Sequence, residues 1–271
     1  MRRKFLAPSL LIQAANQSVC DVEVFMHNAM WSAVAGSVFQ MRRLDVIANN
    51  LANVNTTGFR GDRIMFDSYL AQIDDERFAS NRKNVGNISD YMYTSTNFQQ
   101  GELHQTDNPL DVALATEGYF VVQTDKGPMY TRAGSFQFDL EGQLTTGNGL
   151  LVQGEGGAIQ IRDGLPFEID EQGSVYQEGE EIGRLQVVQI QNPETMEKVS
   201  GKMFKATRAT RIAASDEHRV VQGALEGSNI NLMREMGQMV MAGRAFESYQ
   251  QIISMMDNVN QQANNRLWQV S

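Results

Sequence analysis

A chain of 271 residues is long enough for one or two domains, and its single cysteine excludes an internal disulfide and a cysteine-rich metal site. The formal net charge of −9, with lysine and arginine scattered singly, argues against binding to nucleic acid. Since no apolar run approaches the roughly 20 residues that span a bilayer, we expect no insertion into a membrane.

Residues 1–25 precede the first clear helical pattern and allow three interpretations. Basic residues come before the short apolar stretch Phe5–Ile12, as in a secretory signal, but Pro8 interrupts this stretch and no strong cleavage site follows. The segment can also be a natural disordered extension, or the result of a misassigned start whose true initiator is Met26. We favour the misassigned start, and we expect residues 1–25 to be disordered.

Residues 26–60 are expected to form an N-terminal helix and the turn that ends it. Apolar residues recur from His27 to Asn53 at alternating spacings of four and three, the pattern of helices that supercoil around partners. Asn53 and the turn Asn55–Gly58 then stop the helix, because Asn and Gly tolerate left-handed conformations. This face, the N-terminal seam, comprises Met30, Val34, Ser37, Met41, Leu44, Ala48 and Leu51.

Residues 61–108 carry the weakest pattern and are expected to be a linker. Phe66–Arg77 has a helical character, whereas Asn81–Ser89 is polar and is expected to be a loop. We assign no chemistry to this segment.

Residues 109–222 are expected to form a central all-β domain. Tyr119–Gln123 and Met129–Phe138 are rich in β-branched and aromatic residues, and they flank a turn in which Gly127 is expected to take a positive φ. Short strands separated by glycine turns favour an antiparallel sandwich or open barrel. Further strands are expected at Gln143–Val152, Phe167–Ile169, Ser174–Gln177 and Arg184–Gln191, with a turn at Asp139–Gly142.

Residues 223–271 are expected to contain a C-terminal helix that Asn231 caps and that carries Glu235 in its first turn. About 40 residues from there to Val270 give roughly 60 Å of helix, which exceeds any core that this chain could wrap around it. The sequence therefore predicts an α+β fold whose two terminal helices form a coiled-coil-like pair. The C-terminal seam comprises Met239, Ala242, Phe246, Tyr249, Ile253, Met256, Asn260, Ala263, Leu267 and Val270.

The sequence offers no pattern typical of an active site. His27, His104 and His218 lie far apart and lack the spacing of metal ligands. The glycine clusters complete neither a dinucleotide fingerprint nor a P-loop, and turns explain them. Acidic clusters near Asp74 and Glu180 are explained by solvated turns. We expect no enzyme, no catalytic residue, no cofactor and no metal.

Three groups of residues carry a resemblance to a known family. Asn49–Arg60 reads Asn-Asn-Leu-Ala-Asn-Val-Asn-Thr-Thr-Gly-Phe-Arg, which we call the N-terminal motif. Leu225–Asn231, Arg244–Glu247 and Asp257 form the C-terminal motif. These residues resemble the signatures of the bacterial flagellar axial proteins, which include rod and hook subunits. The β-region adds Leu110–Leu114, Gly118–Val122 and Tyr130–Phe136, and the whole likeness extends from Met26 to Val270.

The resemblance implies a structural subunit of the flagellar basal-body rod that polymerises through its terminal helices, transmits torque and forms the wall of the export channel. It implies copies of the same chain, other rod proteins and the flagellar type III export apparatus as partners. The implied location is the basal body, periplasmic where the host has an outer membrane. A β-region without a large insertion argues against the hook, and the motifs favour the proximal rod over the distal rod.

A second class of function stays open, namely a secreted β-rich hydrolase or adhesin with oligomerising helical ends. For the rod subunit, the expected assembly interface consists of the two seams and the N-terminal motif. Its residues are Met30, Val34, Met41, Leu44, Ala48, Leu51, Asn49, Asn50, Asn53, Asn55, Gly58, Phe59, Met239, Phe246, Tyr249, Ile253, Met256, Asn260 and Leu267.

Overall fold

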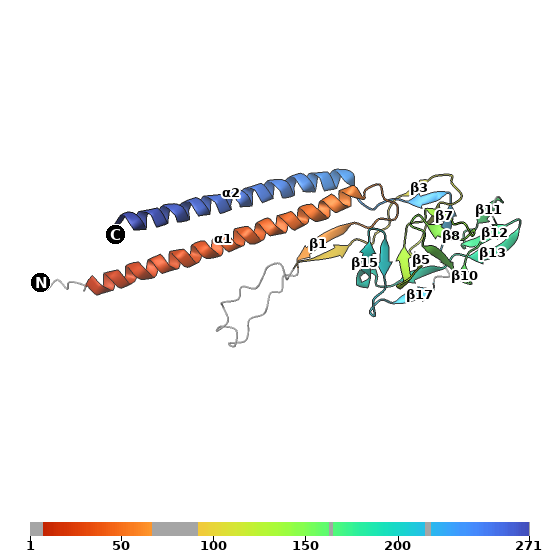
Figure 1. Cartoon of the computed structure of the whole chain (residues 1–271), viewed down its shortest axis with the longest axis horizontal. Coiled ribbons are helices and arrows are strands. Elements are labelled where there is room, and N and C mark those ends of the chain that lie inside the picture. Colours follow the sequence, from red (N-terminus) through yellow and green to blue (C-terminus); the bar gives the residue numbers. More distant parts are fainter. Residues whose placement is uncertain (1–7, 67–91, 163–164, 215–217, 271) are drawn as a thin grey trace. The chain divides into compact units, whose positions relative to one another are not determined.

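The computed structural model of the chain describes residues 8–66, 92–162, 165–214 and 218–270. The chain divides into two compact units (Figure 1). The helical unit contains residues 1–46, 66–93 and 237–271, and the β unit contains residues 47–65 and 94–236. Each unit is therefore built from segments that are distant in the sequence.

The N-terminal helix α1 runs from Pro8 to Ala52 and has 45 residues. It begins well before the predicted start at His27, so residues 8–25 are helical where the sequence predicted disorder. Proline suits the first turn of a helix because its φ is already helical and its missing N–H would be unpaired there. Residues 1–7 lie outside the described part of the chain. The helix ends as predicted in an Asn-rich turn, and Gly58 takes a φ of 68°.

The β unit is antiparallel wherever the register is defined, and this confirms the predicted α+β class with a central antiparallel domain. Its largest sheet has the order β15-β16-β6-β5-β9-β8-β7, with β10 on β9, β14 on β5 and β17 on β14. Smaller sheets pair β11-β12-β13, β18-β4, β19-β3 and β1-β2.

The strands have the following bounds: β1 Asp62–Phe66, β2 Met92–Thr96, β3 Leu103–Gln105, β4 Val112–Leu114, β5 Tyr119–Thr124, β6 Gly127–Thr131, β7 Phe136–Phe138, β8 Leu144–Thr146, β9 Leu151–Gly154, β10 Gly157–Ala158, β11 Phe167–Ile169, β12 Ser174–Gln177, β13 Glu180–Arg184, β14 Val187–Ile190, β15 Glu197–Ser200, β16 Met203–Lys205, β17 Ile212–Ala214, β18 Val220–Gln222 and β19 Ala224–Glu226. A short 3-10 helix, η3, spans Pro193–Thr195.

The predicted hairpin between β5 and β6 is confirmed, because Thr124 pairs with Gly127 and Gly127 has a φ of 102°. Other predicted strands are divided in the structure. The segment Gln143–Val152 is a second hairpin, β8-β9, in which the Gly149 N–H donates a hydrogen bond to the Thr146 carbonyl at 2.8 Å. Met129–Phe138 and Arg184–Gln191 are likewise split into separate strands.

The β unit also extends beyond the predicted limits of 109–222. β3 lies in the predicted linker and pairs with β19, which lies in the predicted C-terminal segment, so that Leu103 is opposite Glu226. Phe66 ends β1 instead of opening a helix. The expected helix up to Arg77 and the loop Asn81–Ser89 lie outside the described residues.

The core of the β unit consists of two clusters. The larger cluster fills the space among β4, β5, β7–β9 and the β11-β12-β13 sheet, and Phe120 packs edge-to-face on Phe136 with ring centroids 5.3 Å apart. The smaller cluster gathers around Phe204, which is fully buried beside Tyr119. These clusters hold the strands that carry the polar junction described below.

The C-terminal helix α2 spans Leu232–Val270 and has 39 residues. Its predicted cap is confirmed, because the Arg234 N–H donates to the Asn231 side-chain oxygen at 3.0 Å and Glu235 lies in the first turn. Among the described residues, no helix is long and apolar enough to cross a membrane.

Candidate assembly site

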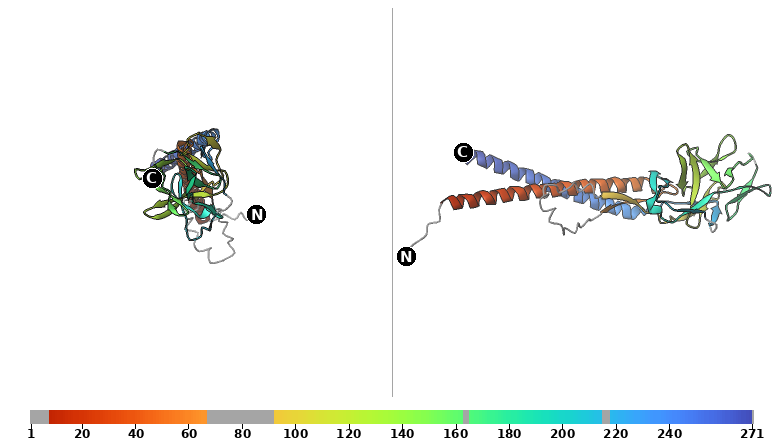
Figure 2. Two further views of the ribbon diagram at one scale, coloured as in Figure 1. Left: turned by 90° about the vertical axis from the view of Figure 1, so that its right-hand side faces the viewer. Right: turned by 90° about the horizontal axis from the view of Figure 1, so that it is seen from below.

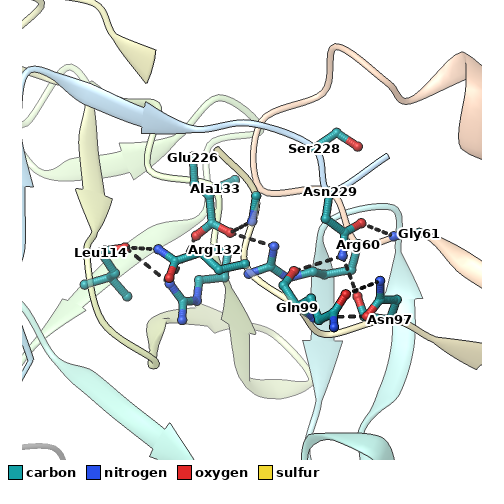
Figure 3. A network of polar contacts seen from close by, with 12 residues as sticks. Arg60, Gly61, Asn97, Gln99, Leu114, Arg132, Ala133, Glu226, Ser228 and Asn229 are labelled. Carbon is teal, nitrogen blue, oxygen red and sulfur yellow. Dashed lines mark hydrogen bonds and ion pairs between the residues drawn. The ribbon is translucent and has the colours of Figure 1, made fainter. Parts of the chain in front are cut away.

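A buried ionic triad joins the two sequence motifs inside the β unit (Figure 3). Arg60, the last residue of the N-terminal motif, lies 2.6 Å from a Glu226 carboxylate oxygen, and both side chains are at most 1% exposed. The other Glu226 oxygen lies 3.1 Å from Arg132, which follows β6. Glu226 also accepts the Gly101 backbone N–H at 3.0 Å. One carboxylate therefore holds three distant segments together.

The triad carries two positive charges for one negative charge in a water-poor setting. Burial lowers the pKa of Arg132, and the neighbouring Glu226 opposes this shift. The Arg132 guanidinium also donates to the Leu114 carbonyl and lies 5.4 Å from the centre of the Tyr119 ring. These contacts satisfy the buried cation in part, as a charge in low dielectric requires.

Two asparagines bind the backbone around the triad (Figure 3 shows Asn229). The Asn229 side chain accepts the Gly61 N–H at 2.9 Å and donates to the Asn97 and Gln99 carbonyls at 2.7 and 2.9 Å. Asn50 makes the corresponding pair of hydrogen bonds with the Asp62 backbone, at 2.9 and 3.0 Å. Asparagine supplies one acceptor and two donors, so each side chain replaces a missing backbone partner.

The glycine of the N-terminal motif is needed for close approach. Gly58 has a positive φ, and a Cβ there would collide with the backbone of Ala133. Its N–H donates to the Glu226 carbonyl at 2.8 Å. Phe59 is fully buried, and the Lys198 ammonium lies 4.3 Å from the centre of its ring. The motif therefore fixes the end of α1 into the β unit of its own chain.

In the helical unit, the Tyr249 ring of α2 lies against Gly36 of α1, where an added Cβ would come within 2.5 Å of the ring (Figure 2 shows the two helices). The neighbouring positions Ala33, Ser37 and Ala242 are buried at 5%, 6% and 1% exposure. Small residues thus permit close contact between the two helices. From residue 250 to 262, the side chains that are not exposed are Ile253, Met256 and Asn260, which are members of the predicted C-terminal seam.

The predicted interface residues fall into three groups. Ser37 and Ala242 are buried; Met30, Val34, Leu44, Leu51, Phe246, Tyr249, Ile253, Met256 and Asn260 are partly buried; Met41, Ala48 and Met239 are exposed. The buried face of α1 follows Ala33, Ser37 and Ile47, so Met41 and Ala48 lie outside it. The side chains of Ala263, Leu267 and Val270 lie outside the described ones.

The residues of the N-terminal motif differ among themselves. Asn50, Gly58 and Phe59 are buried, Asn53 is partly buried, and Asn49 and Asn55 are exposed. The surfaces of the buried residues are covered by their own chain, and the contact of the motif with another subunit stays a prediction.

Sequence reasoning missed two features. The triad was missed because Arg60 and Glu226 are 166 positions apart in the sequence, and no local pattern shows that both are buried. The second feature is an apolar surface of α2 that lies opposite its seam. It comprises Met233, Met236, Val240, Met241, Ile252, Met255 and Val259, with exposures from 38% to 78%. We call it the outer face of α2.

The β unit also has a cavity of about 680 Å³ between Val54–Thr57, the 99–106 segment and Leu225–Met233. Its lining combines amides, hydroxyls and aliphatic groups with His104 and Glu102. Among the described residues, no group of three or more His, Cys, Asp and Glu side chains could hold a metal ion.

A chain whose terminal helices carry apolar faces, and whose two sequence motifs meet at a buried triad inside the β unit, belongs to the class of assembly subunits. Three family models match it: the flagella basal body rod protein at residues 39–60, the flagellar hook protein FlgE/F/G D1 domain at 113–177, and the flagellar basal body rod FlgEFG protein C-terminal region at 221–266. The first and third contain Arg60 and Glu226, respectively.

Curated relatives extend this likeness over most of the chain. The flagellar basal-body rod protein FlgF of Escherichia coli is 32% identical, with 89% of this chain and 99% of the relative covered. The rod protein FlgG of Bacillus subtilis is 31% identical, with 88% and 98% covered. The FlgF of Caulobacter vibrioides is 31% identical, with 86% and 94% covered.

The chain therefore belongs to the flagellar basal-body rod protein family. It is a structural subunit of the rod in the bacterial flagellar basal body. Membership of this family does not support the second class of function that the sequence left open, a secreted hydrolase or adhesin.

Proposed function

We propose that the chain is a proximal-rod subunit that polymerises through its terminal helices. In this proposal, α1 and α2 pair along their seams within one subunit, and the outer face of α2 packs on the terminal helices of neighbouring subunits. The assembled helices form the wall of the export channel, and the β units transmit torque around them. The partners are copies of this chain and other rod proteins, and the flagellar export apparatus delivers the subunits.

The observation that carries the proposal is that α2 has apolar side chains on two opposite sides. At about 100° per residue, Ala242, Tyr249 and Ile253 share one side of the helix, whereas Met233, Met241 and Met255 lie on the other. The first side lies against α1 at Gly36, but the outer face is exposed. A helix with apolar residues on opposite sides is typical of a helix buried by more than one neighbour.

Substituting aspartate at Val240 and Val259 tests this proposal. Both valines lie on the outer face and are 56% and 52% exposed, so the double variant should fold normally and fail to enter rods. Val199→Asp is the matched control, because Val199 is 50% exposed in β15 of the β unit. Complementation of motility and recovery of the variant in purified basal bodies are the readouts. Normal rods containing the double variant would contradict the proposal.

The assignment to the proximal rod rests on the motifs in the sequence, and the distal rod is the second candidate because relatives named FlgG are as similar as those named FlgF. Expression in two deletion strains, one lacking the host's FlgF and one lacking its FlgG, separates the two. We expect motility to return in the FlgF deletion. Restoration of the FlgG deletion alone would assign the chain to the distal rod.

A further inference from the structure

We infer that the methionines on the outer face of α2 are an oxidation site that controls assembly: peroxide converts their thioethers to sulfoxides, and the modified subunit no longer packs on its neighbours. The inference rests on the proposed function of this face. It requires no residue of the buried Arg60–Glu226–Arg132 triad and no bound cofactor.

The first step of the argument is the distribution of methionine along the chain. Six of the 15 methionines of the chain belong to the 39 residues of α2. Four of these lie on the outer face, and the exposed fractions are 78% for Met233, 65% for Met241, 59% for Met255 and 49% for Met236. An apolar surface built from leucine would pack similarly, but methionine brings an accessible, oxidisable sulfur.

The second step is the oxidation itself, which needs hydrogen peroxide as its only co-reactant. A sulfur lone pair attacks one oxygen of hydrogen peroxide, the O–O bond breaks, a sulfur–oxygen bond forms, and water leaves after proton transfer. The thioether loses two electrons, and the peroxide is reduced. The product is a polar, chiral sulfoxide that methionine sulfoxide reductases return to the thioether.

The third step is the effect on packing. The outer face owes its apolar character to these four residues together with Val240, Ile252 and Val259, which peroxide does not modify. A sulfoxide must be desolvated when a neighbour covers it, and a buried polar group without a hydrogen-bond partner opposes association. Oxidation therefore weakens the contact, whereas the buried Met129 and Met196, which are 8% and 9% exposed, are protected from the oxidant.

The first part of the test is the pattern of modification. We expect full-length protein treated with a graded dose of hydrogen peroxide to acquire sulfoxides first at Met233 and Met241, and last at Met129 and Met196. Mass spectrometry of proteolytic peptides measures this order. Equal modification of buried and outer-face methionines in the folded protein would overturn the inference.

The second part is assembly, measured by sedimentation of full-length protein before and after oxidation. We expect the critical concentration to rise at least about ten-fold, the change that follows from the loss of one buried apolar side chain. Treatment with a methionine sulfoxide reductase should restore it. The variant with leucine at positions 233, 236, 241 and 255 should assemble and stay insensitive to peroxide, and the variant with glutamine there should fail without any oxidant.

Three outcomes are decisive. Loss of polymer in the oxidised natural chain, but not in the oxidised leucine variant, supports the inference. Unchanged assembly of the oxidised natural chain, or equal inhibition of the leucine variant, overturns it. Failure of the untreated chain to associate with itself contradicts the proposed function and, through it, this inference.

Discussion

Replacing Glu226 with glutamine would remove the carboxylate that Arg60 and Arg132 share, while it keeps the size of the side chain and an oxygen for the Gly101 N–H. The two arginines would then be buried with no negative charge between them. Breaking a buried ion pair in this way costs about 3–5 kcal/mol of the free energy of unfolding. For the 162 residues of the β unit, this corresponds to a fall in the melting temperature of roughly 6–20 °C.

Glu171 provides a matched control for this prediction. Its carboxylate lies 2.8 Å from Arg219, but the two side chains are 64% and 59% exposed. The same substitution, Glu171→Gln, should cost at most about 1 kcal/mol because water screens an exposed pair. The two variants thus have similar chemistry and similar distances, and they differ in burial.

Thermal and urea unfolding followed by near-ultraviolet circular dichroism would measure both variants, since the buried Tyr119 and Tyr130 report on the β unit. The effect of Glu226→Gln should greatly exceed that of Glu171→Gln. If the two variants lose the same stability, the triad does not hold the junction together, and the account of the two motifs given above is refuted.

Three further predictions concern packing, backbone strain and pH. Gly36→Leu should destabilise the helical unit by about 1–3 kcal/mol through overpacking. Gly243→Leu, where nothing lies within 4 Å, should not destabilise it in a far-ultraviolet melt, because leucine favours a helix more than glycine does; equal effects would contradict the close helix contact. Gly58→Ala should lower the free energy of unfolding by at least about 3 kcal/mol, from a positive φ and a backbone collision, whereas Gly127→Ala, with a positive φ in open space, should cost only about 1–2 kcal/mol; urea titrations would compare them. Burial raises the pKa of Tyr119 above its usual value near 10, so the stability that this group contributes is complete below about pH 10 and is lost as the pH rises through the higher folded value. Tyr119→Phe should reduce the loss of stability above about pH 10, and an unchanged alkaline slope would show that another group controls it.

Local chemistry explains which parts of the fold the sequence predicted well. Gly127 and Asn231 act through their own backbone conformation or a capping hydrogen bond, so the hairpin and the start of α2 were found from a few neighbouring residues. The division of Gln143–Val152 was missed because the segment is rich in strand-forming residues on both sides of a glycine turn. Only pairing with other strands shows where each strand ends.

The candidate site was less predictable than the fold. The two motifs were recognised, but the roles of Arg60 and Glu226 depend on a contact between residues that lie 166 positions apart in the sequence. The outer face of α2 was missed because the four-three spacing directs attention to one side of the helix. The structure was needed to show that the methionines on the other side of α2 stay exposed while the seam side lies against α1.

The late position of Glu226 in the chain has a consequence for how the subunit matures. The chain is made from its N-terminus, so Arg60 and Arg132 are synthesised before Glu226, whose carboxylate they share. For the same reason, β3 has no partner strand until β19 has been synthesised. A chain that stops before residue 224 would lack that strand and leave both cations uncompensated. Such a fragment would fail to complete its β unit as well as lacking α2, so an unfinished subunit would be excluded from the rod by its own unfolded state.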